Sequence, residues 1–225
     1  LREARQRKVP VSGEACPHHF TLTDAAVAGS ETFWQTDGRD LLAHFGDPTE
    51  RPAWPCYDTN FKMNPPLRSA RDREAIIEGL VDGTLEIISS DHAPHCSFEK
   101  EVEFDYAPFG ITGLETELAL SLMQLYHTKR LSLPDLIAKF TVHPARILRL
   151  AKGTLSVGAD ADITVLHPDE AWVFDRAESA SKSFNSPFYG WTMKGRAKAA
   201  IVAGKIVWQD TKSPLSSICG RQEQH

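Results

Sequence analysis

An apolar stretch near the middle of the chain ends in a group of side chains that can do chemistry. Residues 85–90 are rich in isoleucine, and they lead directly into Asp91, His92 and His95. A short apolar run bounded by glycine and proline predicts a strand that is buried on both faces. A carboxylate at the end of such a strand can bind a metal ion, act as a base or cap a structural turn. The two imidazoles can bind a metal ion, a carboxylate or a proton.

A pair of adjacent imidazoles follows a second predicted strand, at residues 9–15. This strand ends in the sequence Glu14-Ala15-Cys16-Pro17-His18-His19. The proline would stop the strand and expose the two imidazoles at its end. Taken by themselves, His18 and His19 fit a functional site and a pair of hydrogen-bonded structural residues equally well.

A third polar side chain, Asn64, follows an alternating segment. Phe61 and Met63 alternate with polar neighbours, which predicts a strand, and Pro65 and Pro66 then force an extended chain. A rigid backbone of this kind would hold Asn64 in one orientation.

The elements between these three segments alternate in type. Ser69 and Asp72 form the pattern of a helix cap, and an apolar stripe follows it as far as Gly83. Strand, helix and strand in this order predict the βα repeat of a parallel sheet or barrel. Since such barrels place their chemistry at the carboxyl ends of the strands, we expect the three polar segments to meet there.

The character of the sequence changes at Gly153, where glycine-punctuated and then alternating segments predict a small β domain. Residues 29–56 are irregular and fit a functional loop, a lid or an insertion. The predicted divisions are an α/β region at 1–152, a β domain at 153–210 and a polar tail at 211–225.

Composition narrows the class of protein. The chain has 225 residues, of which 41% are hydrophobic and 24% charged, with a net charge of -5, as in soluble globular proteins. It carries no block of Lys and Arg and no apolar run of membrane-spanning length, so neither nucleic acid nor a membrane is an expected partner. Four scattered cysteines without a C-x-x-C pattern predict reduced thiols and a cytoplasmic protein. Because the chain begins with Leu1, we expect it to be the C-terminal part of a longer protein.

The polar segments together favour a metal-dependent hydrolase. A bound Zn²⁺ makes hydroxide available near neutral pH, and a nearby carboxylate can accept its proton. Metal-assisted hydrolysis is suited by the groups expected on one face of the βα architecture, namely two imidazoles, a rigid amide and a carboxylate.

Three motifs also carry a resemblance to a known family. The segments at 14–19, 62–68 and 90–95 read Glu-Ala-Cys-Pro-His-His, Lys-Met-Asn-Pro-Pro-Leu-Arg and Ser-Asp-His-Ala-Pro-His. In this order they resemble the dihydroorotases of the amidohydrolase superfamily, in the longer bacterial form. The resemblance covers about residues 1 to 210, except 29–56. It implies the C-terminal part of a (β/α)8 TIM-type barrel followed by a small β-sandwich domain.

The resemblance also assigns roles to individual residues. It implies that Asp91 is a metal ligand and the catalytic base, and that His95 holds the substrate carboxylate. It implies that Asn64 bonds the substrate ring, and that the backbone of Phe109 and Gly110 contacts that ring. His18, His19 and His92 are expected to lie beside the metal ligands rather than on the metal.

The implied reaction is the reversible hydrolysis of (S)-dihydroorotate to N-carbamoyl-L-aspartate in pyrimidine synthesis. The family uses zinc, and we expect two zinc ions in a complete site, with most ligands outside this chain. A catalytic zinc needs about three protein ligands, so we expect the isolated chain to bind no catalytic zinc and to be inactive. A homodimer and an aspartate transcarbamoylase partner are further expectations from the resemblance.

Three other readings stay open at this point. An allantoinase or a hydantoinase would share the β domain and part of the 14–19 motif. A non-catalytic relative that supports a partner protein would differ in the upstream metal ligands. A metal-free structural β domain would leave the three polar segments unexplained.

Overall fold

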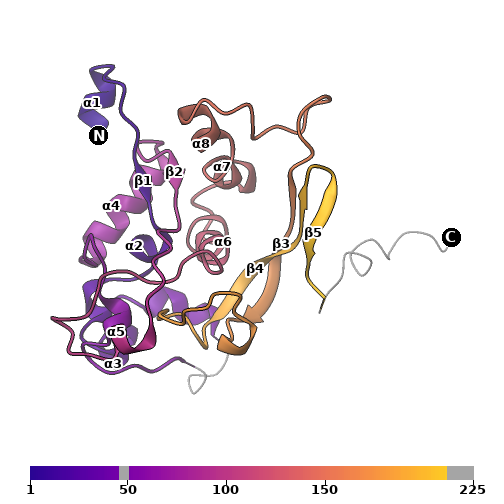
Figure 1. The fold of residues 1–225 in the computed structure, drawn as a ribbon. Helices are drawn as coiled ribbons and strands as arrows, with labels where there is room; N and C mark the ends of the chain where they lie inside the picture. Colours follow the sequence, from indigo (N-terminus) through magenta and orange to yellow (C-terminus); the bar gives the residue numbers. More distant parts are fainter. Residues whose placement is uncertain (46–50, 212–225) are drawn as a thin grey trace.

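The computed structural model describes residues 1–45 and 51–211, which form two sheets and a set of mostly short helices (Figure 1). A two-stranded parallel sheet pairs β1 (Glu14–Ala15) with β2 (Ile87–Ile88). An antiparallel sheet has the order β3 (Ile163–Val173), β4 (Thr192–Val202), β5 (Lys205–Gln209). The helices are α1 (Arg2–Gln6), α2 (Pro17–Thr21), η1 (Asp24–Ala26), α3 (Ser30–Gln35), η2 (Arg39–His44), η4 (Thr59–Phe61), α4 (Ala70–Val81), α5 (Ser97–Lys100), α6 (Glu117–Ser121), the π-helical η5 (Leu122–Tyr126), α7 (Leu133–Ala138), α8 (Val142–Ile147) and η6 (Arg176–Glu178).

The predicted βα repeat is present around β1, α4 and β2. The hydroxyl of Ser69 accepts a hydrogen bond from the backbone N–H of Asp72, so the predicted cap of α4 is confirmed. Parallel pairing aligns Glu14 with Ile87. The strand predicted at 85–90 is shortened to β2, and the N–H of Leu85 bonds to the carbonyl of Gly79 in α4. The two carboxyl ends nevertheless lie side by side, as the sequence predicts.

The strand predicted around Phe61 and Met63 is wrong. This stretch contains the 3-10 helix η4, and the carboxylate of Asp58 caps it by accepting a hydrogen bond from the N–H of Asn60. Phe61 and Met63 are both buried. A single tight turn has therefore produced the same in-out alternation that a strand would give.

Two apolar cores hold the elements together. One lies beneath β1 and β2, where Phe20, Leu80 and Ile88 meet residues of η5 and α7. The other is aromatic and surrounds Trp191, which contacts Phe33, Trp34, Phe45, Trp54 and Phe188.

The aromatic core joins distant parts of the sequence. The described part of the irregular segment 29–56 contributes buried aromatic side chains to it, and so does the region after residue 153. The division into domains at 153 and the reading of 29–56 as a lid or an insertion stay predictions. The predicted tail lies outside the described residues apart from Thr211.

The antiparallel sheet is tied together by a buried cation. Lys198 on β4 places its ammonium group 2.7 Å from Glu170 of β3 and 2.7 Å from Asp210, which directly follows β5. A tight turn joins β4 to β5, with Ala203 and Gly204 both at positive φ. Helix α6 packs against β4, so it stands between the two sheets (Figure 1). None of the helices in the described ranges is long and apolar enough to cross a membrane.

Candidate functional site

Asp91 lies just beyond the carboxyl end of β2, in a backbone conformation that is unusual for its type. Its φ is 48°, in the left-handed region, and its side chain is exposed. Aspartate tolerates this region better than most residues, yet the conformation costs roughly 1 kcal/mol. Within the part of the chain that the structure describes, no hydrogen bond or ion pair to the Asp91 carboxylate is found. The carboxylate is therefore free to take a metal ion or a proton.

The two imidazoles on α2 are both held in the neutral form. Burial lowers the pKa of His18 to about 3, and the neighbouring His19 lowers it further. Burial also lowers the pKa of His19, against the opposing effects of a hydrogen bond to the Pro65 carbonyl and of the Asp91 charge. The Nε2 of His19 lies 2.7 Å from that carbonyl oxygen. Since a carbonyl only accepts, Nε2 carries the proton and Nδ1 keeps a lone pair.

Cys16 joins the two imidazoles in a group that could hold a metal ion. One ligand atom from each of Cys16, His18 and His19 lies within 4.8 Å of the others. Burial raises the pKa of the Cys16 thiol to about 12, and the charge of Asp91 adds to this effect. The charge of Asp91 thus acts on both Cys16 and His19, so the carboxylate and this group lie near each other. Carboxylate, imidazole and thiol are donors that suit zinc, and the arrangement fits one wall of a metal site.

The other two predicted imidazoles bind the backbone of a loop. The Nδ1 of His92 accepts a hydrogen bond of 3.1 Å from the N–H of Gly113. The Nε2 of His95 lies 2.9 Å from the carbonyl oxygen of Phe109 and donates to it. The Nδ1 of His95 is 3.8 Å from the carboxylate of Glu99, with which it forms an ion pair when the ring is protonated. His95 therefore has one nitrogen committed to the loop and the other facing Glu99.

The loop at 108–111 bonds to two of the three predicted segments, those at 62–68 and 90–95. The N–H of Gly110 donates to the carbonyl of Lys62, two residues before Asn64. The N–H of Ala93 donates to the carbonyl of Ile111. Phe109 and Asn64 are both exposed. The structure thus brings Asn64, Asp91, His95 and the loop to one place. It brings His19 there as well, through its bond to the residue after Asn64.

Two buried polar residues and a partly buried one in this region carried no recognisable signal in the sequence. Lys100 and Asn185 are 6% and 5% exposed, and both bond to the loop at 108–111. Glu117 begins α6 near Cys16, and burial raises the pKa of its carboxyl group to about 7. Their environments are made by distant segments of the chain, so only the fold identifies them.

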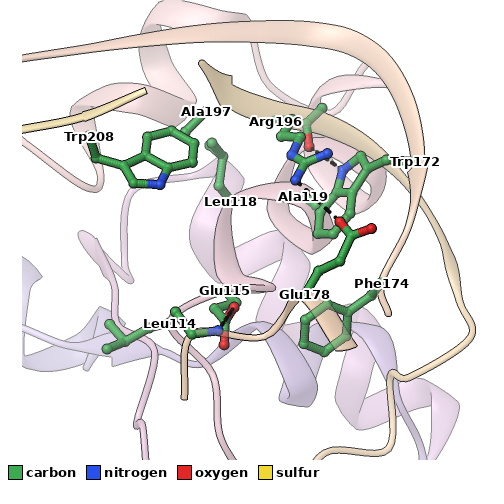
Figure 2. A pocket seen from close by; sticks show the side chains of 12 residues that line it. Leu114, Glu115, Leu118, Ala119, Trp172, Phe174, Glu178, Arg196, Ala197 and Trp208 are labelled. Atoms are coloured by element: carbon green, nitrogen blue, oxygen red, sulfur yellow. Dashed lines mark hydrogen bonds and ion pairs between the residues drawn. The ribbon is translucent and has the colours of Figure 1, made fainter. Parts of the chain in front are cut away.

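Two pockets lie beside this group and do not include Asn64, Asp91 or His95. One, of about 300 Å³, is lined by α6 and by the antiparallel sheet. Figure 2 shows Arg196 there, with Trp172 on one side and Glu178 on the other. The second, of about 550 Å³, has Glu117 in its wall.

The sequence has relatives of known family. Residues 50–207 match the model of the amidohydrolase family. A dihydroorotase of Syntrophus aciditrophicus is 46% identical over 210 residues, which is 93% of this chain and 43% of the relative. A dihydroorotase of Geobacter sp. strain M21 is 47% identical over 209 residues, with the same coverage. The chain thus spans less than half the length of these curated relatives.

Solved structures give the same fold. A D-hydantoinase from a Thermus species superposes with a TM-score of 0.73 at 22% identity, covering 93% of this chain and 42% of that one. An L-hydantoinase from Arthrobacter aurescens superposes with a TM-score of 0.73 at 26% identity and the same coverage. The predicted fold, part of a TIM-type amidohydrolase barrel, is confirmed.

Proposed function

Because this chain belongs to the amidohydrolase family, we propose that the complete protein, the product of the reading frame containing it, is a dihydroorotase. It would catalyse the reversible hydrolysis of (S)-dihydroorotate to N-carbamoyl-L-aspartate. The observation that carries the proposal is the convergence of Asp91, His95, Asn64 and the loop at 108–111 in a chain about 46% identical to dihydroorotases.

Asp91 is the proposed base. Its carboxylate is exposed and unpaired among the described residues, so it can accept the proton of the attacking water and deliver it to the departing ring nitrogen. Its strained backbone is consistent with such a role, since strained residues gather at functional sites. The 108–111 loop supplies backbone groups near the substrate ring.

His95 and Asn64 are the proposed substrate contacts. His95 has Nδ1 directed away from its bond to the loop, and in the protonated ring this nitrogen can donate to the substrate carboxylate. Asn64 offers both a donor and an acceptor at an exposed position, which suits the amide groups of a cyclic substrate.

The family implies a metal cofactor, and we propose zinc, with two ions in the complete site. Asp91 would bind one of them. When bound, the metal would make hydroxide available near neutral pH. Cys16, His18 and His19 offer further donors beside Asp91, although most ligands are proposed to come from outside this chain.

The test is turnover by the complete protein. Purified protein loaded with zinc is assayed with dihydroorotate, allantoin and hydantoin, together with the isolated 225-residue chain. We expect turnover of dihydroorotate alone, and only by the complete protein. Preference for allantoin or hydantoin would replace the proposal with a sister cyclic amidohydrolase, and no turnover would favour a non-catalytic relative.

A further inference from the structure

Two buried polar side chains from other parts of the chain donate hydrogen bonds to the backbone of the loop at 108–111. Lys100 ends helix α5, and Asn185 precedes β4. Both are almost completely buried. Burying an ammonium group and an amide is costly unless each is hydrogen-bonded, so their partners indicate what the two residues do.

The ammonium group of Lys100 bonds to the loop backbone. Its Nζ lies 2.9 Å from the carbonyl oxygen of Pro108 and 3.1 Å from that of Gly110. These carbonyls lie on either side of Phe109, whose own carbonyl takes the hydrogen bond from His95. Three successive carbonyls of the loop are thus held by protein donors, which fixes the backbone on both sides of Phe109.

Asn185 connects the same loop to the segment that carries Asp91 and His95. Its Nδ2 donates to the carbonyl of Ala93 at 2.9 Å and to that of Gly110 at 3.3 Å. Its Oδ1 accepts the N–H of His95 at 3.0 Å, and its backbone carbonyl accepts the N–H of Thr112 at 3.0 Å. One buried residue therefore ties the backbone at 93–95 to the backbone at 110–112.

We propose that Lys100 and Asn185 are positioning residues, which together fix the substrate-binding loop at 108–111 relative to Asp91 and His95. The inference rests on the proposed function for its substrate but not for its geometry. A loop that contacts the substrate through backbone groups cannot be adjusted by its own side chains, so its position has to be set by such anchors.

The chain offers matched controls for both residues. Lys139 is a second buried lysine whose Nζ bonds to a backbone carbonyl, that of Leu85, but it lies at the opposite end of β2. Ser186 is buried beside Asn185, and its hydroxyl accepts from the N–H of Phe188 rather than bonding to the loop. Lys139→Met and Ser186→Ala therefore remove comparable polar groups without touching the anchors.

The first measurement is steady-state kinetics of the zinc-loaded complete protein with dihydroorotate. We expect Lys100→Met and Asn185→Ala to raise KM about 10-fold or more while kcat changes less than about 3-fold, because the loop binds substrate and transition state alike. Asn185→Asp keeps the acceptor for His95 but loses both side-chain donors, so it should also raise KM. If Lys100→Met does not fold, the KM of Asn185→Asp still tests whether the loop is anchored. An unchanged KM, or an equal rise in Lys139→Met or Ser186→Ala, would overturn the proposal.

The second measurement needs no activity. Hydrogen exchange of the complete protein is followed in peptides covering 105–113 and 84–90. Lys100→Met and Asn185→Ala should speed exchange about 10-fold in the first peptide only, and Lys139→Met in the second only. Unchanged exchange at 105–113 would sink the anchoring role. If the parent protein does not turn over dihydroorotate, the proposed function fails, and this measurement still decides whether the anchors exist.

Discussion

The two ends of β2 are built from similar residues for opposite purposes. At the amino end, the carboxylate of Glu86 pairs with Arg5 and Arg146, and Lys139 caps the carbonyl of Leu85. At the carboxyl end, Lys100 again caps backbone carbonyls, but the carboxylate of Asp91 has no such partner in the described residues. At the first end, Glu86 and Lys139 both have protein partners. The second end leaves one carboxylate open to a ligand.

Backbone conformation separates the two ends as well. Glu86 continues directly into the strand, whereas Asp91 lies in the left-handed region. Strain next to an unpaired carboxylate opposes stability, and the hydrogen bonds of Asn185, Lys100 and His92 hold the surrounding loops around it. The carboxyl end of β2 is therefore a locally unfavourable arrangement held by neighbours that are well bonded.

The substitution Asp91→Asn has the largest expected effect and tests whether the carboxyl end of β2 serves catalysis. We expect kcat of the complete protein to fall about 1000-fold or more, which is about 4 kcal/mol of barrier, because the base is lost. The thermal midpoint of the metal-free protein should not fall, since the carboxylate makes no stabilising pair among the described residues and asparagine tolerates a positive φ. Activity assays and thermal unfolding measure both. A fall in stability without a loss of kcat would assign Asp91 a structural role.

A second test uses the pH dependence of stability. The carboxyl of Glu117, near the active end, has a pKa raised by burial from 4.5 to about 7. The folded state then binds more protons than the unfolded state between these values, so stability falls as the pH rises from about 4.5 to 7, by about 2 kcal/mol. Urea unfolding at several pH values should show this slope, and Glu117→Gln should flatten it. An equal slope in the variant would contradict the assignment.

His95 tests the side of the site that binds substrate. We expect His95→Ala to raise KM for dihydroorotate about 10-fold, or about 1.4 kcal/mol, because both the ligand contact and the bond to Phe109 are lost. His95→Gln can still donate to the Phe109 carbonyl, so it separates the two contributions. If it restores KM completely, His95 only anchors the loop.

Glu86→Gln is the smallest effect and the control for Asp91→Asn. It should destabilise the protein by about 1 kcal/mol, because Arg5 and Arg146 are both partly exposed and solvent screens their pairs. Activity should stay within about 2-fold of the parent. Unfolding in low and high salt measures the loss of stability. A large fall in kcat would show that the amino end of β2 also serves catalysis, which contradicts the comparison.

The sequence predicts the candidate residues at the carboxyl end of β2 through local patterns. These patterns are the apolar run ending in Asp91, the proline before His18 and the cap at Ser69. Each spans only a few residues, so it can be recognised without knowledge of the fold. The same locality explains the error at Phe61 and Met63. Alternating burial arises from a strand or from a single 3-10 turn, and only the capping bond from Asp58 distinguishes them.

What the sequence determined by itself was the chemistry on offer: a carboxylate, imidazoles and a rigid amide after predicted strands, in motifs that resemble one family. What only the tertiary structure decided was how these groups are held. Nothing in the local sequence marks Lys100 and Asn185 as buried, or Glu117 as partly buried. Their roles follow from contacts with residues as far as 92 positions away in the chain, as in the bond from Asn185 to Ala93. Burial and hydrogen-bond partners over such separations are properties of the packed chain, and no short stretch of sequence encodes them.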